Sequence, residues 1–491
     1  MLVDWDIIRR IIEAVLAINA VLAFWTVFRS HRDIASTWAW LLVLTIFPYV
    51  GFIAYLFVGR QLSHDKIFSI QEEQAALRNR ILRKQRQLIA GNKHIKHKRE
   101  RQLVDLFLST NDALLTTDNQ VKIFTDGQEK FDSLIADINA AKDHVLIEYY
   151  SFYADNLGKR ILTALEHAAQ RGVQVRVLYD MAGSRGTTYK FFTQLEAYGG
   201  LAQAFASKAK ARFTTPRMNY HLHRKLAIID GQIGYIGGFN IGDQYLGEDP
   251  KFGYWRDTHL RVVGQAVKMM TVRFAMDWNT TCRGTDKPRI NIEDQFKNFE
   301  VKPPLADPDL VPMQIVASGP DNEEYAIRRG YEAIIGSAKQ YIYIQTPYLI
   351  PEDSYLEALI IAARSGVDVR IMIPCMPDHP FVYRATEYYA KYLVENGVKV
   401  YKYDKGFLHA KTMVSGNDIA SVGSANMDYR SFRLNFEVNA FAYNKKLTAQ
   451  LKQIFEDDLQ DCTLLTEEYF AQQSSWRKFK QHFSRMLSPI L

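Results

Sequence analysis

Two copies of one small constellation, a histidine, a lysine and an asparagine, stand far apart in a chain of 491 residues. In each copy one residue separates the histidine from the lysine, a glycine follows the lysine after twelve positions, and the asparagine comes three residues later. A single His-x-Lys pair is usually an ordinary surface pair, but a second copy with matched spacing is not a chance match. The two sets are His223, Lys225 and Asn240, and His409, Lys411 and Asn426.

These residue types suit chemistry on a phosphodiester. An imidazole can attack phosphorus or carry a proton, while an ammonium and an amide N–H hold anionic oxygens. If the two copies close on one phosphate about a pseudo-twofold axis, one histidine attacks in line and the other protonates the departing oxygen. The lysines and asparagines then surround the non-bridging oxygens, which makes a metal unnecessary, and the sequence offers no carboxylate cluster to hold one. We therefore expect no metal and no other cofactor.

A β-hairpin has to position each set. The residues before Asp230 alternate as in a strand, which places His223 and Lys225 on one face. Asp230 and Gly231 form a strong hairpin-turn dipeptide. The return strand, 233–236, ends at a glycine pair that lets the backbone approach a ligand closely. The imidazole, the ammonium and the amide are therefore expected to converge at one end of the hairpin.

The double His-x-Lys pattern resembles that of the phospholipase D superfamily, and three flanking segments resemble bacterial cardiolipin synthases. These segments are residues 373–380, 406–412 and 435–439, and the likeness covers nearly the whole chain. The resemblance implies that the two motif histidines and the two motif lysines are catalytic. It also implies that the substrate is phosphatidylglycerol in an anionic membrane. One molecule would form a phosphatidyl-histidine and release glycerol, and the hydroxyl of a second would then take the phosphatidyl group to give cardiolipin.

Two carboxylates downstream of the asparagines can support the histidines. Asp257 and Glu437 are candidates to bond the far ring nitrogens and so fix the tautomers. For Asp257, a surface charge at a strand edge is an equal alternative, whereas Glu437 lies in the family-like segment 435–439. The sequence does not decide which histidine attacks.

The chain departs from the family pattern at two positions. Family members commonly carry arginine two residues before the first motif histidine, where this chain has His221. They also place an aspartate five residues after each motif lysine; Asp230 fits this pattern, but the second copy has Gly416. In an extended strand the fifth residue lies ~16 Å from the lysine and on the opposite face. We therefore expect this position to shape the turn and not to touch the phosphate.

Composition limits the class of protein. The net charge of +7 and the pI near 9.0 favour an anionic partner, and a chain this long predicts about three structural units. The three cysteines lie far apart without metal-ligand spacing, which indicates reduced thiols. Cys375 has no obvious base beside it, so we do not expect it to be catalytic.

Two apolar stretches near the start predict a transmembrane hairpin over residues 1–66. The expected spans, 9–28 and 37–58, are each close to the ~20 residues that cross a bilayer. A cleavable signal peptide fits poorly, because no small-x-small site precedes the loop and a second span follows at once. The segment 67–110 is basic and predicted helical, which favours a cytoplasmic side. We expect a multi-pass protein of the bacterial inner membrane with its catalytic body in the cytoplasm.

The remainder reads as a duplicated α/β unit. The predicted strands 145–150 and 173–179 have counterparts at 340–345 and 367–373, with a helix between the members of each pair. Such alternation predicts mixed sheets flanked by helices; with the resemblance, it implies two tandem phospholipase-D-like α/β sandwich domains. We place them at 111–282 and 313–491, joined by a linker over 283–312. The second ends in a basic helix that suits either an interfacial or a simple docking role.

Other functions remain open from the residues alone. A lipid hydrolase or a phosphatidylserine synthase would use the same histidines, and a nuclease would explain the basic charge. Membrane spans add nothing to DNA cleavage, so we expect no nucleic-acid partner. A non-catalytic scaffold fits poorly with two intact sets. The oligomeric state and the acyl-chain preference are not determined by the sequence.

Overall fold

The structure is a computed structural model, and it forms two compact units that are considered separately. The first unit comprises Met1–Ile67 with Ser207–Tyr220, and the second comprises Phe68–Ala206 with His221–Leu491. The residues described are 5–29, 34–47, 51, 79, 81–87, 98–205, 220–292, 294, 307, 309–322, 324–416 and 418–488. Parts of the predicted segments 67–110 and 283–312 therefore lie outside them.

The first unit contains helices α1 (Trp5–Arg29) and α2 (Ile34–Ile46). The predicted span 9–28 lies within α1, whereas the predicted span 37–58 continues past α2 and beyond the described residues. Within the described ranges, no helix combines the length and the apolar character that a membrane crossing requires. The transmembrane hairpin therefore stays a prediction.

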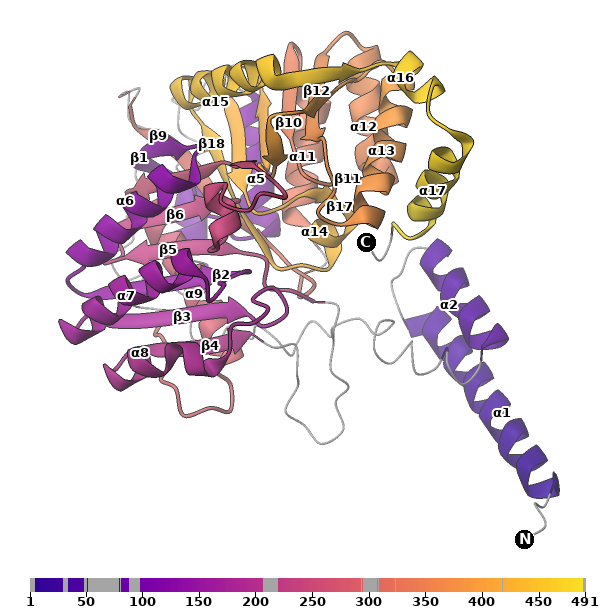
Figure 1. The fold of residues 1–491 in the computed structure, drawn as a ribbon, viewed down its shortest axis with the longest axis horizontal. Helices are drawn as coiled ribbons and strands as arrows, with labels where there is room; N and C mark the ends of the chain where they lie inside the picture. Colours follow the sequence, from indigo (N-terminus) through magenta and orange to yellow (C-terminus); the bar gives the residue numbers. More distant parts are fainter. Residues whose placement is uncertain are drawn as a thin grey trace. The chain divides into compact units, whose positions relative to one another are not determined.

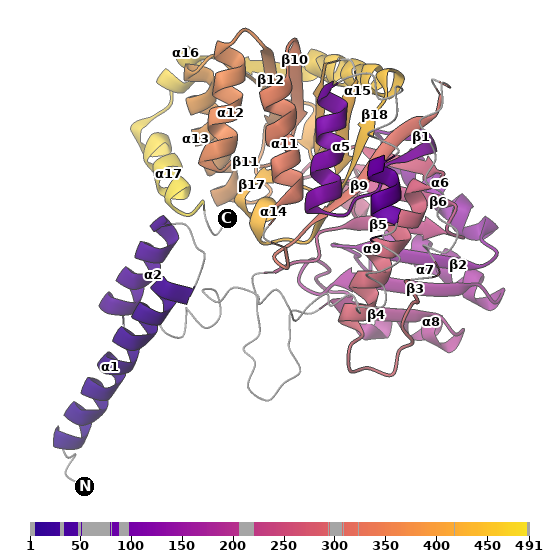
Figure 2. The same ribbon diagram turned by 180° about the vertical axis from the view of Figure 1, so that it is seen from behind.

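The second unit is built on one mixed sheet of 15 strands (Figures 1 and 2). Its order is β19-β13-β12-β10-β15-β16-β18-β9-β1-β8-β6-β5-β2-β3-β4. We expected a mixed sheet in each half, and the structure joins them through the antiparallel pair β1 and β9. Read outward from this pair, the two halves repeat the same order of strands, as a pseudo-twofold duplication requires, and the second half adds β19 at its outer edge.

The first half, which follows helix α5 (Lys98–Thr110), runs from β1 to α9. Its elements are β1 (Thr116–Phe124), α6 (Gly127–Ala140), β2 (His144–Tyr149), α7 (Asn156–Gln170), β3 (Gln174–Asp180), η3 (Tyr189–Phe192), α8 (Thr193–Ala197), β4 (Leu201–Phe205), β5 (Lys225–Ile229), β6 (Ile233–Gly237), η4 (Asp243–Leu246), β7 (Tyr254–Arg256), β8 (His259–Val263) and α9 (Ala266–Thr281). The strands predicted over 145–150 and 173–179 agree with β2 and β3 to within a residue at each end.

The second half runs from β9 to α17. Its elements are β9 (Val311–Ser318), α11 (Ala326–Ser337), β10 (Tyr341–Gln345), β11 (Leu349–Ile350), α12 (Asp353–Arg364), β12 (Asp368–Pro374), α13 (Pro380–Glu395), β13 (Lys399–Tyr403), β14 (Gly406–Leu408), β15 (Thr412–Ser415), β16 (Ile419–Gly423), β17 (Met427–Asp428), α14 (Tyr429–Arg433), β18 (Glu437–Tyr443), α15 (Lys445–Asp458), η5 (Leu459–Asp461), β19 (Cys462–Leu465), α16 (Glu467–Ala471) and α17 (Ser475–Met486).

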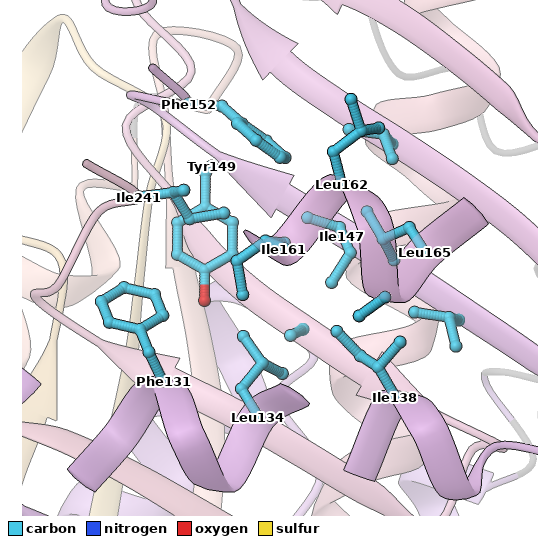
Figure 3. Close-up of a cluster of buried hydrophobic side chains, with 14 of the residues drawn as sticks. Phe131, Leu134, Ile138, Ile147, Tyr149, Phe152, Ile161, Leu162, Leu165 and Ile241 are labelled. Atoms are coloured by element: carbon cyan, nitrogen blue, oxygen red, sulfur yellow. The ribbon is translucent and has the colours of Figure 1, made fainter. Parts of the chain in front are cut away.

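Helices cover the sheet because each has one apolar stripe. In α6, Phe131, Leu134 and Ile138 recur at helical spacing and are fully buried. They meet Ile147 of β2 and Ile161 of α7 in the core cluster that Figure 3 shows. Burying each such side chain contributes roughly 1.5–3 kcal/mol. This layer holds β2 firmly, and β2 in turn pairs with β5, the strand that begins at the first motif lysine.

Candidate active site

Each predicted hairpin is present, with its histidine just before the outgoing strand. Strand β5 pairs with β6 and β15 pairs with β16, both antiparallel. In the second copy the backbone N–H of Gly423 donates to the carbonyl of Lys411 at 3.3 Å, so the repeated spacing brings the return strand back beside the lysine. Position 238 requires glycine, because a Cβ there would lie 2.0 Å from Oδ1 of Asp257. Any side chain would therefore displace that carboxylate.

The two histidines are held by carboxylates that cross between the halves. His223 of the first half lies with Nδ1 2.9 Å from both carboxylate oxygens of Glu437 in the second. His409 of the second half lies with Nδ1 2.6 Å from Oδ2 of Asp257 in the first. Both carboxylates are fully buried, so Asp257 is not a surface charge. Because Nδ1 is occupied in both rings, Nε2 is the nitrogen left for a substrate.

Backbone pairing enforces this crossing. The N–H of His223 donates to the carbonyl of Phe436 at 2.9 Å, and the N–H of His409 donates to that of Arg256 at 2.7 Å. Strand β14, which ends one residue before His409, runs parallel to β7, which ends one residue before Asp257. Each histidine is therefore carried on backbone that is hydrogen-bonded to the residue preceding its carboxylate partner.

The two motif lysines are buried beside their histidines. Lys225 Nζ donates to the carbonyl of His223 at 2.6 Å, and Lys411 Nζ donates to that of His409 at 2.5 Å. Each ammonium keeps two further N–H groups for a ligand. Burial lowers the pKa of Lys225 well below its ordinary value, and burial lowers the pKa of Lys411 to about 8 although Asp257 and Glu437 oppose this.

The asparagines lie at the same ends of the hairpins, and both are buried. Asn240 donates from Nδ2 to the hydroxyl of Tyr245 at 2.9 Å, and its Oδ1 accepts from the N–H of Ser151 at 3.2 Å. Asn426 donates from Nδ2 to Asp428 at 3.1 Å, and within the described part of the chain its Oδ1 is buried without a hydrogen bond. Each side-chain amide has two N–H groups, and these hydrogen bonds use one of them.

The site is electrostatically prepared for an anion. Burial lowers the pKa of His223 well below 6.5, and Lys225, Lys411 and His409 lower it further, which indicates that the cationic groups of both halves act on one another. Burial lowers the pKa of His409 to about 4, with Lys411 as the next cause. Burial raises the pKa of Glu437 to about 7, and Lys225 opposes this rise. An anion bound among these groups would raise the imidazole pKa values again.

Asp230 and Gly416 lie at the far turns, as the spacing predicts. The carboxylate of Asp230 accepts from the backbone N–H groups of Lys142, Asp143 and His144 at 2.8–3.2 Å. Partial burial opposes ionisation, but these donors lower the pKa of Asp230 below its ordinary value. The residue has φ +54°, and Gly416 has φ +59°, so both positions need the left-handed region that aspartate, asparagine and glycine tolerate.

Several neighbours of the site were not found from the sequence. The ring of Tyr150 lies 4.8 Å from that of His223, and Ser424 donates to Glu437 at 2.5 Å. Arg224, between the motif histidine and lysine, is buried and donates from Nε to the carbonyl of Glu437 at 3.1 Å. Arg224 precedes β5, which begins at Lys225, so the alternation within the strand gave no signal for it.

His221, where family members carry arginine, has Nδ1 3.7 Å from Asp180, which also accepts from the N–H of Leu222 at 2.9 Å.

None of the three cysteines, all of which the structure describes, is in a disulfide. Across the described ranges, no three histidine, cysteine, aspartate or glutamate side chains are grouped so as to hold a metal ion.

Comparison with known proteins gives a consistent likeness. A family model described as cardiolipin synthase, phospholipase-D-like domain matches residues 134–278 and 331–459, and one described as phospholipase D-nuclease N-terminal matches residues 18–60. A cardiolipin synthase of Listeria innocua is 50% identical over 99% of this chain and 100% of its own length. One of Staphylococcus aureus is 46% identical over 99% of this chain and 97% of its own length.

Among solved structures, a phosphatidylserine synthase of Haemophilus influenzae matches with a TM-score of 0.62. The match covers 79% of this chain and 100% of that one at 15% sequence identity. At this identity the likeness concerns the fold alone.

Proposed function

This chain belongs to the cardiolipin synthase family of phospholipase-D-like proteins, and on that premise we propose that it joins two phosphatidylglycerol molecules into cardiolipin and glycerol. It is a phosphatidyltransferase. The observation that carries the proposed mechanism is the crossed pairing of His223 with Glu437 and of His409 with Asp257. Each imidazole is fixed at Nδ1 by the opposite half, so the two Nε2 atoms serve one phosphate from two sides.

The first step forms a P–N bond and breaks a P–O bond. Nε2 of one histidine attacks phosphorus in line, and the glycerol oxygen leaves with a proton from Nε2 of the other. In the second step that other histidine takes the proton from a hydroxyl of the second phosphatidylglycerol. This oxygen attacks phosphorus, the P–N bond breaks, and the first histidine is restored. The bonds broken and made are alike, so the reaction is close to thermoneutral and reversible.

The other buried groups stabilise charge during both steps. The ammonium groups of Lys225 and Lys411 and the remaining amide N–H groups of Asn240 and Asn426 donate to the non-bridging oxygens, where negative charge builds up. The carboxylates hold the histidine tautomers and stabilise whichever imidazolium forms. All these groups are already buried and oriented, so little reorganisation is needed when the phosphate binds.

A lipid hydrolase or a phosphatidylserine synthase would use the same histidines with a different acceptor. Relatives named cardiolipin synthase that match over the whole chain favour transfer between phosphatidylglycerol molecules. Incubation of the membrane-bound protein with phosphatidylglycerol alone should yield cardiolipin and glycerol in equal amounts. Phosphatidate and glycerol without cardiolipin would contradict the proposal.

We also propose that residues 1–66 form a membrane hairpin with the catalytic body on the cytoplasmic side of a bacterial inner membrane. The family match over residues 18–60, the apolar runs and the basic segment after them support this placement. A chain lacking residues 1–60 should be released from membranes more readily and still make cardiolipin from detergent-mixed substrate. A truncated, folded chain that makes none would show the hairpin to be part of the catalytic scaffold.

A further inference from the structure

Helix α17 docks through its polar face and exposes its apolar face, which is the reverse of what is expected for a helix on a globular protein. Its sequence alternates aromatic and basic residues, which left open whether it lies at a membrane or docks on the body. Ser474 caps it by accepting the N–H of Arg477 at 3.3 Å. In both views α17 lies beside α13, at the end of the second half where β11, β17 and α14 are found (Figures 1 and 2). The structure shows which face docks and which remains free.

The docked face is polar. Gln481 and Ser484 are buried, and Gln481 donates to Glu387 of α13 at 3.1 Å. Arg477 forms an ion pair with the same glutamate. Two residues beyond the helix, Ser488 lies within hydrogen-bonding distance of the hydroxyl of Tyr389 of α13, at 3.3 Å. Hydrogen bonds and a charge pair thus fix the orientation of α17 on the second half.

The free face is apolar. Trp476, Phe479, Phe483 and Met486 are 65, 57, 48 and 78% exposed. Their spacing of three, four and three residues puts them in one stripe, opposite the docked residues. The rings of Trp476 and Phe479 stack at 5.4 Å with 10° between their planes, so these two rings form one continuous part of the stripe. An ordinary surface helix turns such a stripe toward the core, and this one presents it outward.

Cations border this stripe, and the helix has no acidic residue. Apart from Arg477, which pairs with Glu387 on the docked face, the basic side chains are Lys478, Lys480 and Arg485. Lys480 Nζ lies 5.8 Å from the centre of the Trp476 ring, at the margin of the apolar face. Aromatic side chains that enter the acyl boundary, with cations at the level of the headgroups, match the surface of an anionic bilayer.

We infer that α17 is a second membrane-contacting element, which inserts its outward stripe into the surface of an anionic phospholipid bilayer. The position of α17 in the fold links it to the site. Helix α13 supports β11 through a hydrogen bond from the N–H of Leu349 to Thr386, and β11 pairs with β17, which directly follows Asn426. A bilayer that binds α17 therefore meets the second half at the end that carries the site. This rests on the proposed function only in that the substrate is a membrane lipid.

Depth measurements on the full chain test the inference. Nitroxide labels would be placed singly at the four stripe positions and, as matched controls on the same helix, at Lys478 and Arg485, in an active parent whose three cysteines are replaced. The chain is reconstituted in vesicles of phosphatidylglycerol and phosphatidylcholine. Collision with oxygen, which dissolves in lipid, should dominate at the stripe, and collision with a water-soluble nickel complex at the two controls. Equal water exposure at all six positions would overturn the inference. Stripe positions shielded from both reagents, to a degree that rises with protein density in the vesicles, would also overturn it, because such shielding indicates contact with a second copy of the chain.

A kinetic arm connects insertion to turnover. The variant Trp476→Ser/Phe479→Ser/Phe483→Ser should raise the KM for phosphatidylglycerol in vesicles about tenfold, with kcat unchanged, because surface contact is lost while the site is intact. Ile361→Ser, which removes an equally exposed apolar side chain from α12, is the control and should leave KM unchanged. An unchanged KM in the triple variant contradicts the inference. A chain without synthase activity that still shows the depth pattern would contradict the proposed function and leave the membrane contact standing.

Discussion

The two halves build the same His-Lys-Asn hairpin but fasten its turn with opposite charges. In the first half the carboxylate of Asp230 accepts from three backbone N–H groups at the start of β2. In the second, Gly416 has no side chain, and Arg99 of α5 donates to Ser415 at 2.5 Å and to Ser337 at 2.8 Å. The turns have nearly the same φ, 54° and 59°. The aspartate of the repeated pattern therefore has a structural task that an arginine from elsewhere can perform.

A second difference lies behind the catalytic strands. Glu148 of β2 is opposite Leu226 and Gln345 of β10 is opposite Thr412, so the glutamate and the glutamine occupy equivalent places. Burial and the nearby Asp277 raise the pKa of Glu148 well above its ordinary value. Gln345 donates to Asp458 at 2.7 Å instead. The two halves therefore have the same geometry at the site, but the first half buries a glutamate behind it where the second half buries a glutamine.

The largest effect should come from the groups that both halves contribute equally. His223→Ala and His409→Ala should each reduce cardiolipin synthesis by at least ~10²-fold, because acid–base participation alone contributes ~10²–10⁴-fold. Synthesis from phosphatidylglycerol in detergent-mixed micelles measures this, with thermal unfolding as the control for folding. If either variant kept more than about a hundredth of the wild-type rate, the histidines would not share one site.

Asn426→Ala should have the next largest effect. If its free amide N–H stabilises charge on the non-bridging oxygens, kcat should fall roughly 10²-fold with a smaller change in KM, as for loss of one oxyanion donor. Asn240→Ala is the matched variant in the other half and should behave alike. A loss confined to thermal stability, with kcat retained, would reassign both residues to holding Asp428 and Tyr245 in place.

We expect Glu437 and Lys411 to set the two limbs of the pH dependence. Glu437 has a pKa of about 7, so as the pH falls through 7 it takes up a proton and no longer stabilises the His223 imidazolium. Lys411 has a pKa of about 8 and loses its charge as the pH rises through 8. A plot of kcat/KM against pH should therefore be bell-shaped with limbs near these values.

Two variants separate the origins of this profile. Glu437→Gln should lower the maximum roughly 10–10²-fold and remove the acid limb. Asp257→Asn should also lower the maximum, while keeping that limb because Glu437 is intact. An acid limb that persists in Glu437→Gln would assign it to another group.

The smallest effects concern the turns. Gly416→Asp should change activity less than a few-fold, because aspartate accepts φ +59° and the atom nearest an added Cβ, at 2.8 Å, belongs to the flexible and positively charged Arg99. The reciprocal change, Asp230→Gly, should lower the free energy of unfolding by about 1–2 kcal/mol through loss of a cap on three N–H groups. Its activity below the unfolding transition should stay near normal. A large gain in rate from Gly416→Asp would mean that the natural second site is a weakened one.

Much of the fold and site follows from local patterns. Strand alternation located β2, β3, β10 and β12, and the spacing from lysine to glycine located both hairpins. The position five residues after the lysine was correctly assigned to the turn by simple distance. These inferences succeed because they depend on periodicity within one element.

What the sequence did not yield depends on contacts between distant segments. Asp257 and Glu437 were candidates to hold the histidines, but the exchange of partners between halves follows from β7 pairing with β14, which leaves no local signal. The role of Arg99 and the joining of two sheets through β1 and β9 are of the same kind. For α17 the amphipathic pattern gave the stripe, but only packing against α13 decides which way it faces.

The central claim is that both halves form one site in which a single phosphatidyl group is carried on histidine. Rapid quenching of the enzyme with phosphatidylglycerol radiolabelled in phosphorus tests it most directly. The account predicts acid-labile, alkali-stable phosphorus on protein, at no more than one per chain, and no such label in at least one of His223→Ala and His409→Ala. Two labels per chain, or a full single label in both variants, would contradict it.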